Sequence, residues 1–149
     1  MKNSKLLLLI ASILLGSCFF QKEKEETKIY NIPTLETNHE YSEIKEFELT
    51  WEGIFDPTEN EYFVYFYSTS CNHCAEIKNF IIEEALKKKN MYFVKGSNEV
   101  VLTDDVYPTI GAKSIDKISI LGFPSCLKII DHTCTKNVAG TSQIKEIIK

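Results

Sequence analysis

The sequence predicts one mixed α/β domain over residues 44–149, and three observations predict it. A short, continuously apolar or aromatic segment at 62–67 is typical of a strand buried on both faces. Apolar residues at helical spacing follow it, and further along the chain two strand-like segments flank a two-residue turn. Strands and helices in this order favour a mixed sheet with helices packed against it.

A targeting segment precedes this domain. Two lysines lead into an apolar stretch at 6–15 that is too short to span a bilayer comfortably. The stretch ends in Leu-Gly-Ser-Cys at 15–18, which resembles the lipobox of bacterial lipoproteins. That resemblance implies that 1–17 are a signal peptide and that Cys18 is acylated, which anchors the chain to a membrane. A plain secretory signal or a lone anchor helix is the alternative.

The composition of the remaining chain excludes some partners. Removal of the signal peptide leaves residues 18–149 and takes two lysines with it, so the formal charge changes from −4 to −6. An acidic chain without any arginine gives no support for nucleic-acid binding and lacks bidentate phosphate clamps. Residues 18–43 include a mixed charge run without apolar periodicity, which predicts a flexible tether.

The folded domain is expected to begin near Ile44. Apolar and polar residues alternate from Phe47 to Trp51, which predicts a half-buried strand. A turn cluster at 56–60 then leads into the buried strand at 62–67.

A helix is predicted from Cys71 to about Lys89. Its apolar positions recur every three or four residues: Cys74, Ile77, Ile81 and Ala85. Three lysines suit the negative end of this helix, and Asn90 suits its stop. A short strand at 91–94 follows.

The second half of the domain is less regular. Residues 95–117 carry Asp, Pro and Gly, which predict a loop, with a short helix at 111–117. A strand at 124–130, a turn at Asp131-His132 and a returning strand at 133–138 form a hairpin.

The chain closes with a helix over 141–149. Three isoleucines share one face of this segment, and Thr141 or Ser142 is the expected N-cap.

The pair Cys71 and Cys74 carries the predicted chemistry. Two thiols separated by two residues can close a disulfide across the first helical turn. Cys71 would lie where unpaired N–H groups and the positive end of the helix dipole favour the thiolate, which is the reactive form. A structural disulfide or half of a zinc site are the alternatives.

Three features in order resemble thioredoxin-fold proteins over residues 44–149. They are the Cys71–Cys74 motif after a buried strand, Gly-Phe-Pro-Ser at 122–125 before the next strand, and the hairpin with its terminal helix. The resemblance implies a central mixed sheet flanked by helices and a cis peptide bond at Pro124, which faces the two cysteines. It also implies thiol–disulfide oxidoreductase activity without a cofactor.

The resemblance assigns a role to each site residue. Cys71 is the nucleophile, and Cys74 resolves the mixed disulfide. His73 tunes the Cys71 thiolate, and its position before the second cysteine resembles disulfide isomerases and periplasmic oxidases, which favours these slightly over reductases. The backbone at Phe123 pairs with a substrate strand. The alternatives are a solvent-facing His73 without a role and a Phe123 that only packs in the core.

Two positions depart from the family pattern. Thioredoxins and several relatives carry a buried acidic residue six positions before the first cysteine, where this chain has Tyr65, and Ser70 replaces the usual Trp. Glu76 or Glu61 is a candidate substitute for the missing acid.

Cys126 and Cys134 form a possible second disulfide across the hairpin. With a two-residue turn, Cys134 faces Ile129 and Cys126 faces Asn137, which argues against the pair unless a bulge shifts the register. A metal site built from Cys71, Cys74, Cys126 and His132 has no standard zinc spacing.

The sequence therefore predicts a lipid-anchored oxidoreductase on the periplasmic or extracellular side of a bacterial cell envelope. Its expected partners are cysteine-containing exported proteins, an unidentified redox protein and the membrane through Cys18. The rival hypothesis is a non-catalytic lipoprotein binding module in which Cys71–Cys74 is a permanent staple.

Overall fold

The computed structural model describes residues 37–149. The predicted signal peptide at 1–17, the acylation site Cys18 and most of the tether at 18–43 lie outside the described residues. No helix within 37–149 has the length and apolar character needed to cross a membrane.

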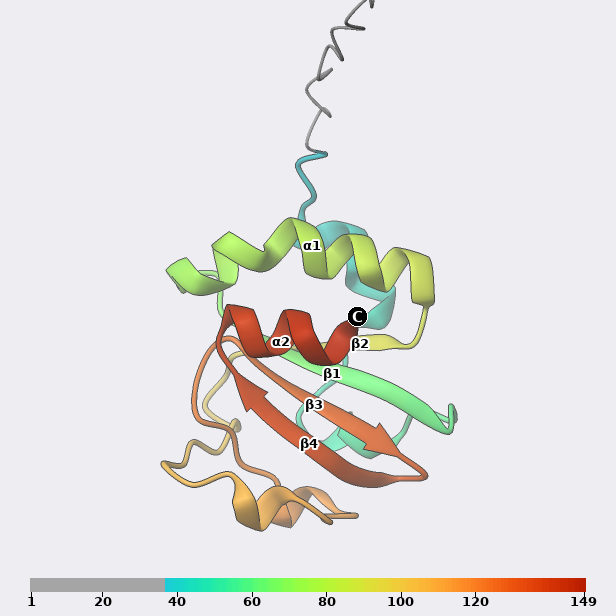
Figure 1. Cartoon of the computed structure of the whole chain (residues 1–149), viewed down its shortest axis with the longest axis vertical. Coiled ribbons are helices and arrows are strands. Elements are labelled where there is room, and N and C mark those ends of the chain that lie inside the picture. The colour runs from blue at the N-terminus through green and yellow to red at the C-terminus, as the bar shows by residue number, and fades with distance from the viewer. Residues whose placement is uncertain (1–36) are drawn as a thin grey trace, which may run out of the picture. The chain divides into compact units, whose positions relative to one another are not determined.

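A four-stranded mixed sheet forms the centre of the domain, with strand order β2-β1-β3-β4 (Figure 1). The central strand β1 pairs in parallel with β2 and antiparallel with β3, and β3 and β4 form an antiparallel hairpin. The strands are β1 (Glu61–Tyr67), β2 (Met91–Lys95), β3 (Ser125–Ile130) and β4 (Thr133–Ala139). The four corresponding strand predictions are confirmed.

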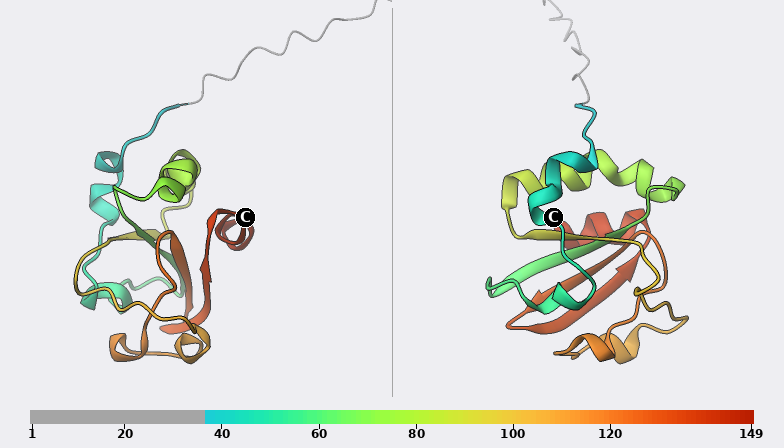
Figure 2. Two further views of the ribbon diagram at one scale, coloured as in Figure 1. Left: turned by 90° about the vertical axis from the view of Figure 1, so that its left-hand side faces the viewer. Right: turned by 180° about the vertical axis from the view of Figure 1, so that it is seen from behind.

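Two α-helices cover one face of the sheet, α1 (Asn72–Lys88) and α2 (Thr141–Ile148) (Figures 1 and 2). The 3-10 helix η1 (Tyr41–Phe47) packs beside α1 on this face. Short 3-10 turns, among them η2 (Glu52–Phe55), cover the other face. This architecture confirms the central mixed sheet flanked by helices that the sequence predicted.

The alternating residues of β1 explain this layering. Neighbouring side chains of a strand point to opposite faces, so Tyr65 lies in the apolar cluster under the α-helices, while Val64 and Phe66 lie in the cluster on the other face. The whole strand after its first residue is buried, as expected for a strand in the middle of a covered sheet.

The strand predicted from Phe47 to Trp51 is wrong. This segment makes only an isolated bridge from Glu48 to Phe93 at the β2 edge, where the Leu49 N–H donates to the Phe93 carbonyl at 2.8 Å. Ile44 belongs to the core under the α-helices, and Trp51 to the core on the other face. The chain crosses the sheet edge between them, and this crossing produces an alternation that resembles a strand.

The sequence predicts that the domain begins at Ile44, but the residues just before Ile44 already contact the domain. The Tyr41 ring stacks on Tyr67 with ring centroids 3.9 Å apart. The His39 N–H donates to Oδ1 of Asn79 on α1 at 3.0 Å. Residues just before Ile44 are therefore held against the domain.

The segment between β2 and β3 has no α-helix, so the helix predicted at 111–117 is wrong. It contains two single turns, η3 (Tyr107–Thr109) and η4 (Ile115–Lys117). Gly111 adopts a positive φ of 89° between them, which a continuous right-handed helix excludes.

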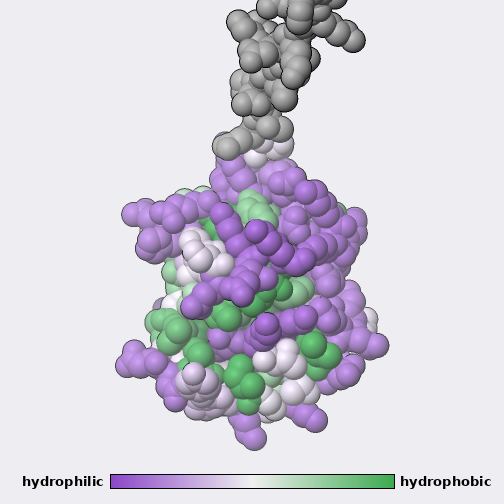
Figure 3. Space-filling model, viewed as in Figure 1, coloured by the Kyte–Doolittle hydropathy of each residue, from purple (hydrophilic) through white to green (hydrophobic). Residues whose placement is uncertain are grey.

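The exposed large apolar side chains of the described residues lie on this segment: Val101, Leu102, Tyr107, Ile110 and Leu121. Figure 3 shows apolar patches at the lower end of the domain. The α2 N-cap is Gly140 rather than Thr141 or Ser142, and it makes no side-chain cap.

Candidate functional site

Cys71 occupies the N-cap of α1, directly after the turn that ends β1. The turn is closed by the Cys71 N–H, which donates to the Ser68 carbonyl at 3.2 Å. The Cys71 side chain replaces the usual capping oxygen, because its Sγ accepts the Cys74 N–H at 3.2 Å. The thiol is partly exposed and lies at the positive end of the helix.

Cys74 lies one turn inside the helix and is only 1% exposed. Burial, followed by the hydrogen bond with Cys71, raises the pKa of the Cys74 thiol to about 12. The two thiols therefore differ in access: Cys71 faces the outside, and Cys74 faces the core.

The loop before β3 approaches the same helix end. The Phe123–Pro124 peptide bond is cis, as the resemblance implied. The Cys71 thiol donates to the Phe123 carbonyl at 3.3 Å. Residues 52 positions apart in the chain are thus in direct contact at the predicted site.

Gly96 provides the space for Phe123. A Cβ at residue 96 would lie 2.8 Å from Cζ of the Phe123 ring, closer than a real side chain tolerates. The ring therefore packs directly over the backbone that follows β2, and this contact holds the loop carrying Pro124.

His73 lies beside the cysteines but faces solvent, with 72% of its side chain exposed. Its Nδ1 is 3.2 Å from Oε2 of Glu76, one turn along α1. The structure thus gives His73 a surface partner on its own helix.

Neither candidate acid is a buried carboxylate near Cys74. The Glu76 side chain is 60% exposed and pairs with His73, while Glu61 is 48% exposed and pairs with Lys128 at 2.8 Å. The position six residues before Cys71 holds Tyr65, whose ring is fully buried.

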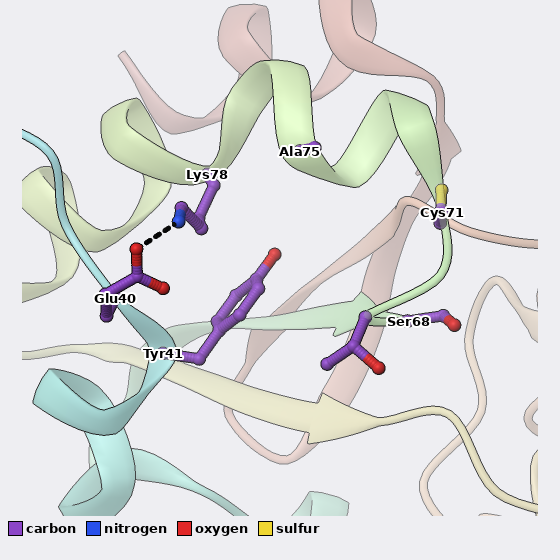
Figure 4. Close-up of a pocket in the computed structure, with 7 residues that line it drawn as sticks. Glu40, Tyr41, Ser68, Cys71, Ala75 and Lys78 are labelled. Atoms are coloured by element: carbon purple, nitrogen blue, oxygen red, sulfur yellow. Dashed lines mark hydrogen bonds and ion pairs between the residues drawn. The ribbon is translucent and has the colours of Figure 1, made fainter.

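A pocket of about 200 Å³ opens beside Cys71 (Figure 4). An ion pair between Lys78 Nζ and Glu40 Oε1, at 2.9 Å, closes one side, and the Tyr41 ring forms part of the wall. Its lining residues are Glu40, Tyr41, Ser68, Thr69, Cys71, Ala75 and Lys78.

No role for Tyr41 is predicted from the sequence, because it lies within the residues expected to form the tether. The one local signal is Glu43, whose carboxylate accepts the Glu40 N–H at 2.7 Å in the manner of a capping box. That pattern marks a helical turn at Tyr41, although it does not indicate a site.

Cys126 and Cys134 do not meet. Cys134 pairs with Ile129 as predicted, but a bulge between Lys128 and Ile129 places Cys126 opposite Val138 rather than Asn137. Cys126 lies in the core under the α-helices, and Cys134 lies in the core on the other face. The sheet separates the two thiols, and both are free.

Residues 37–149 contain no cluster of three or more His, Cys, Asp or Glu that could hold a metal ion.

Comparison with protein-family models and with curated proteins finds no match. Solved structures similar to this chain include a Plasmodium falciparum thioredoxin, with 18% identity and a TM-score of 0.44 over 68% of this chain and 94% of that one. Thioredoxin f2 of Chlamydomonas reinhardtii matches at 16% identity and a TM-score of 0.43, over 68% of this chain and 89% of that one. Mitochondrial thioredoxin 3 of Saccharomyces cerevisiae matches at 15% identity and a TM-score of 0.45, over 68% of this chain and 91% of that one.

Proposed function

We propose that this thioredoxin-fold chain is a thiol–disulfide oxidoreductase that exchanges disulfides with other proteins through Cys71 and Cys74. The observation that supports this function best is the placement of Cys71. Its thiol is accessible at the start of α1, receives the Cys74 N–H and touches the carbonyl of Phe123, while Cys74 lies buried behind it. A permanent structural disulfide would not need an accessible sulfur at the meeting point of two loops.

The exchange proceeds in two steps. The Cys71 thiolate attacks one sulfur of a substrate disulfide, which breaks that S–S bond and forms a mixed disulfide. Cys74 then attacks Cys71 Sγ, closes the Cys71–Cys74 bond and releases the second substrate thiol. The substrate gains two electrons and the protein loses two, and the same steps run backwards when the protein acts as an oxidant.

The Phe123 backbone is the proposed contact for an extended substrate segment. It directly precedes the cis bond to Pro124 and already reaches Cys71 through its carbonyl. A substrate strand that pairs here would bring its own sulfur next to the nucleophile.

His73 favours the oxidising direction in this proposal. A group that stabilises the reduced thiolate form makes the protein a stronger oxidant. We expect His73→Pro to lower the reduction potential, with Glu76→Gln as a control that removes only the surface partner of the imidazole. An unchanged potential in His73→Pro would contradict the tuning role.

We place the protein at the bacterial cell envelope, attached through acylated Cys18, with cysteine-containing exported proteins as substrates. The support is the lipobox-like ending of the apolar stretch at 6–15. A Cys18→Ala protein should lose its partition into detergent, while a Cys126→Ala protein should keep it. A Cys18→Ala protein that still enters the detergent phase would contradict the anchor.

A glutathione redox titration tests the activity. The mature chain with Cys18→Ala is equilibrated over a range of glutathione ratios, and Cys71 and Cys74 are read by alkylation and mass. A potential of roughly −120 to −180 mV supports an oxidase or isomerase, and one near about −270 mV supports a reductase. A pair that stays oxidised at every ratio would favour the binding module with a structural staple.

Trapping identifies the nucleophile in the same preparation. Cys74→Ser should accumulate mixed disulfides through Cys71, because the second step is blocked. Cys71→Ser is the matched control and should accumulate none.

A further inference from the structure

Two tyrosine hydroxyls next to the Cys71–Cys74 motif have no assigned purpose. The Oη atoms of Tyr41 and Tyr65 are both buried, and neither forms a hydrogen bond of regular geometry among the described residues. A buried hydroxyl without a partner is costly, and native proteins keep few of them. Their retention here calls for an explanation beyond packing.

The two phenols connect Cys74 to the pocket. Tyr65 lies on β1 under α1, and its neighbouring ionisable groups are Tyr41 and the Cys74 thiol. Tyr41 comes from η1, neighbours Tyr65 in turn and lines the pocket that also contains Cys71. Figure 4 shows the Tyr41 hydroxyl directed toward the space below α1. The order in space is therefore Cys74, Tyr65, Tyr41, pocket.

Cys74 has to lose a proton before it can attack Cys71, and its burial opposes this. The groups that shift the pKa of this thiol, besides its burial, are Cys71, the Ser68 backbone and Tyr65, and none of them is a carboxylate. Glu40 is the carboxylate among the residues that line the pocket, and it is already paired with Lys78. The ionisable groups around Cys74 and the two phenols are Cys71, Tyr67, Cys126, Glu40 and Lys78.

We propose that Tyr65 and Tyr41 form a proton path from the Cys74 thiol to the pocket beside Cys71. This inference rests on the proposed function and deepens it. Each phenol accepts a proton at Oη while passing its own hydroxyl proton onward, so neither has to ionise. The Tyr65 hydroxyl then also donates a hydrogen bond to the sulfur on which negative charge develops.

The resolving step balances with this path. The Cys74 proton moves to Tyr65, the Tyr65 proton moves to Tyr41, and the Tyr41 proton enters the pocket. Cys74 Sγ attacks Cys71 Sγ, and the electrons of the broken bond leave with the substrate sulfur. Because the pocket borders Cys71, the departing thiolate is placed to take up the proton that Tyr41 releases.

Tyr67 provides a matched control within the same aromatic cluster. It stacks on Tyr41 and on Tyr65, but its hydroxyl donates to Glu48 Oε1 at 2.6 Å. Tyr67→Phe removes the same atom from the same cluster without interrupting the path.

The test separates the two chemical steps with an aromatic disulfide, 5,5′-dithiobis(2-nitrobenzoate), mixed rapidly with the reduced full-length protein in detergent. Attack by Cys71 releases the first coloured thiolate, and attack by Cys74 releases the second. That thiolate is a stable anion near neutral pH, so the second rate reports loss of the Cys74 proton rather than protonation of the leaving group.

We expect Tyr65→Phe to slow the second release about tenfold or more at neutral pH, the effect of one lost hydrogen bond to a charged sulfur. The pH at which this rate rises should move upward, and its solvent deuterium isotope effect should shrink. Tyr41→Phe should slow the same step, whereas Tyr67→Phe should leave it unchanged. The first release should be the same in all three variants.

Equal second rates in the wild type and Tyr65→Phe, with equal pH profiles, would overturn the proton path and leave the proposed function intact. Equal slowing by all three variants would also overturn it, because the effect would then arise from packing. A wild-type protein that releases neither thiolate would instead overturn the proposed function. Thermal melting confirms that each variant is folded before its rates are compared.

Discussion

At the scale of single residues, the tyrosine hydroxyls of this domain fall into distinct groups. Tyr62 donates to the Ile54 carbonyl at 3.0 Å, whereas Tyr65 has no partner in the described structure. Tyr107 is 83% exposed to solvent. The same chemical change, removal of one oxygen, therefore has a different cost at each position.

We expect Tyr62→Phe to lower the free energy of unfolding by about 1–3 kcal/mol, because the buried Ile54 carbonyl loses its donor. Tyr65→Phe should leave stability unchanged or raise it slightly, because its hydroxyl is buried without a hydrogen bond. Urea unfolding of both variants measures this, with Tyr107→Phe as the exposed control. An equal loss of unfolding free energy in Tyr62→Phe and Tyr65→Phe would contradict the difference in hydrogen bonding between the two hydroxyls.

At the scale of elements, the end of α1 carries a strained residue. Lys89 adopts a left-handed conformation with a φ of 56°, and its N–H donates to the Ala85 carbonyl at 2.9 Å. Glycine is the residue that tolerates this C-terminal position best. The lysines of this turn suit the helix dipole, but Lys89 is unfavourable for the backbone.

Lys89→Gly should therefore raise the free energy of unfolding by about 0.5–1 kcal/mol. Lys87→Gly should lower it by about 1 kcal/mol, because residue 87 lies inside the helix and its ammonium pairs with Glu83 at 2.7 Å. Thermal or urea unfolding measures both variants. A loss of stability at both positions would show that the left-handed conformation is not the controlling factor.

The contact between β2 and the loop before β3 is the second prediction at this scale. Gly96→Ala should displace the Phe123 ring and cost about 1–3 kcal/mol, because the new Cβ would lie 2.8 Å from it. Phe123→Leu in the same chain should restore part of this stability by making space. Urea unfolding of the two single variants and the double variant gives the coupling, and simple additivity would contradict the clash.

The elements differ in how well their sequences predict them. The strand β1 and the helix α1 have strong periodic patterns and were correctly predicted, as was the hairpin turn at Asp131-His132. The crossing at Phe47–Trp51 has the sequence pattern of a strand, because side chains that pass from one core to the other alternate just as strand residues do. The segment between β2 and β3 depends on tertiary contacts and has little local signal.

In the candidate site, too, some features have a local sequence signal and others depend on tertiary contacts. Cys71, Cys74 and Pro124 are recognisable from local motifs, and the cis bond was correctly expected. The proximity of Tyr41 to the motif depends on how η1 packs against α1, and no local pattern reports that packing. The bulge that shifts Cys126 away from Asn137 is likewise set by the pairing of β3 with β4.

At the scale of the whole molecule, two cores enclose three buried thiols. Burial raises the pKa of Cys126, and it raises those of Cys74 and Cys134 to about 12. The pKa of a cysteine in the unfolded chain is about 8.5. Below that pH both the folded and the unfolded protein keep the thiol protons, and above it the unfolded protein loses them first. The free energy of unfolding is therefore at its full value at neutral pH and falls as the pH rises toward 12.

The reduced protein should therefore lose stability between pH 8.5 and 10, by up to about 1.4 kcal/mol per pH unit for each buried thiol. Cys134→Ala should have a shallower decline, whatever its stability at pH 7. Urea unfolding under reducing conditions across this range measures the slopes. The same slope in the wild type and the variant would contradict the prediction.

The sheet that divides the two cores also limits how many electrons the described domain can carry. Cys126 and Cys134 lie on its opposite faces and cannot join while the strands stay paired. A disulfide formed between Cys71 and Cys74 thus has no route into the hairpin for storage. Under the proposed function, the described domain transfers a single pair of electrons in each cycle and has to pass it on before accepting the next.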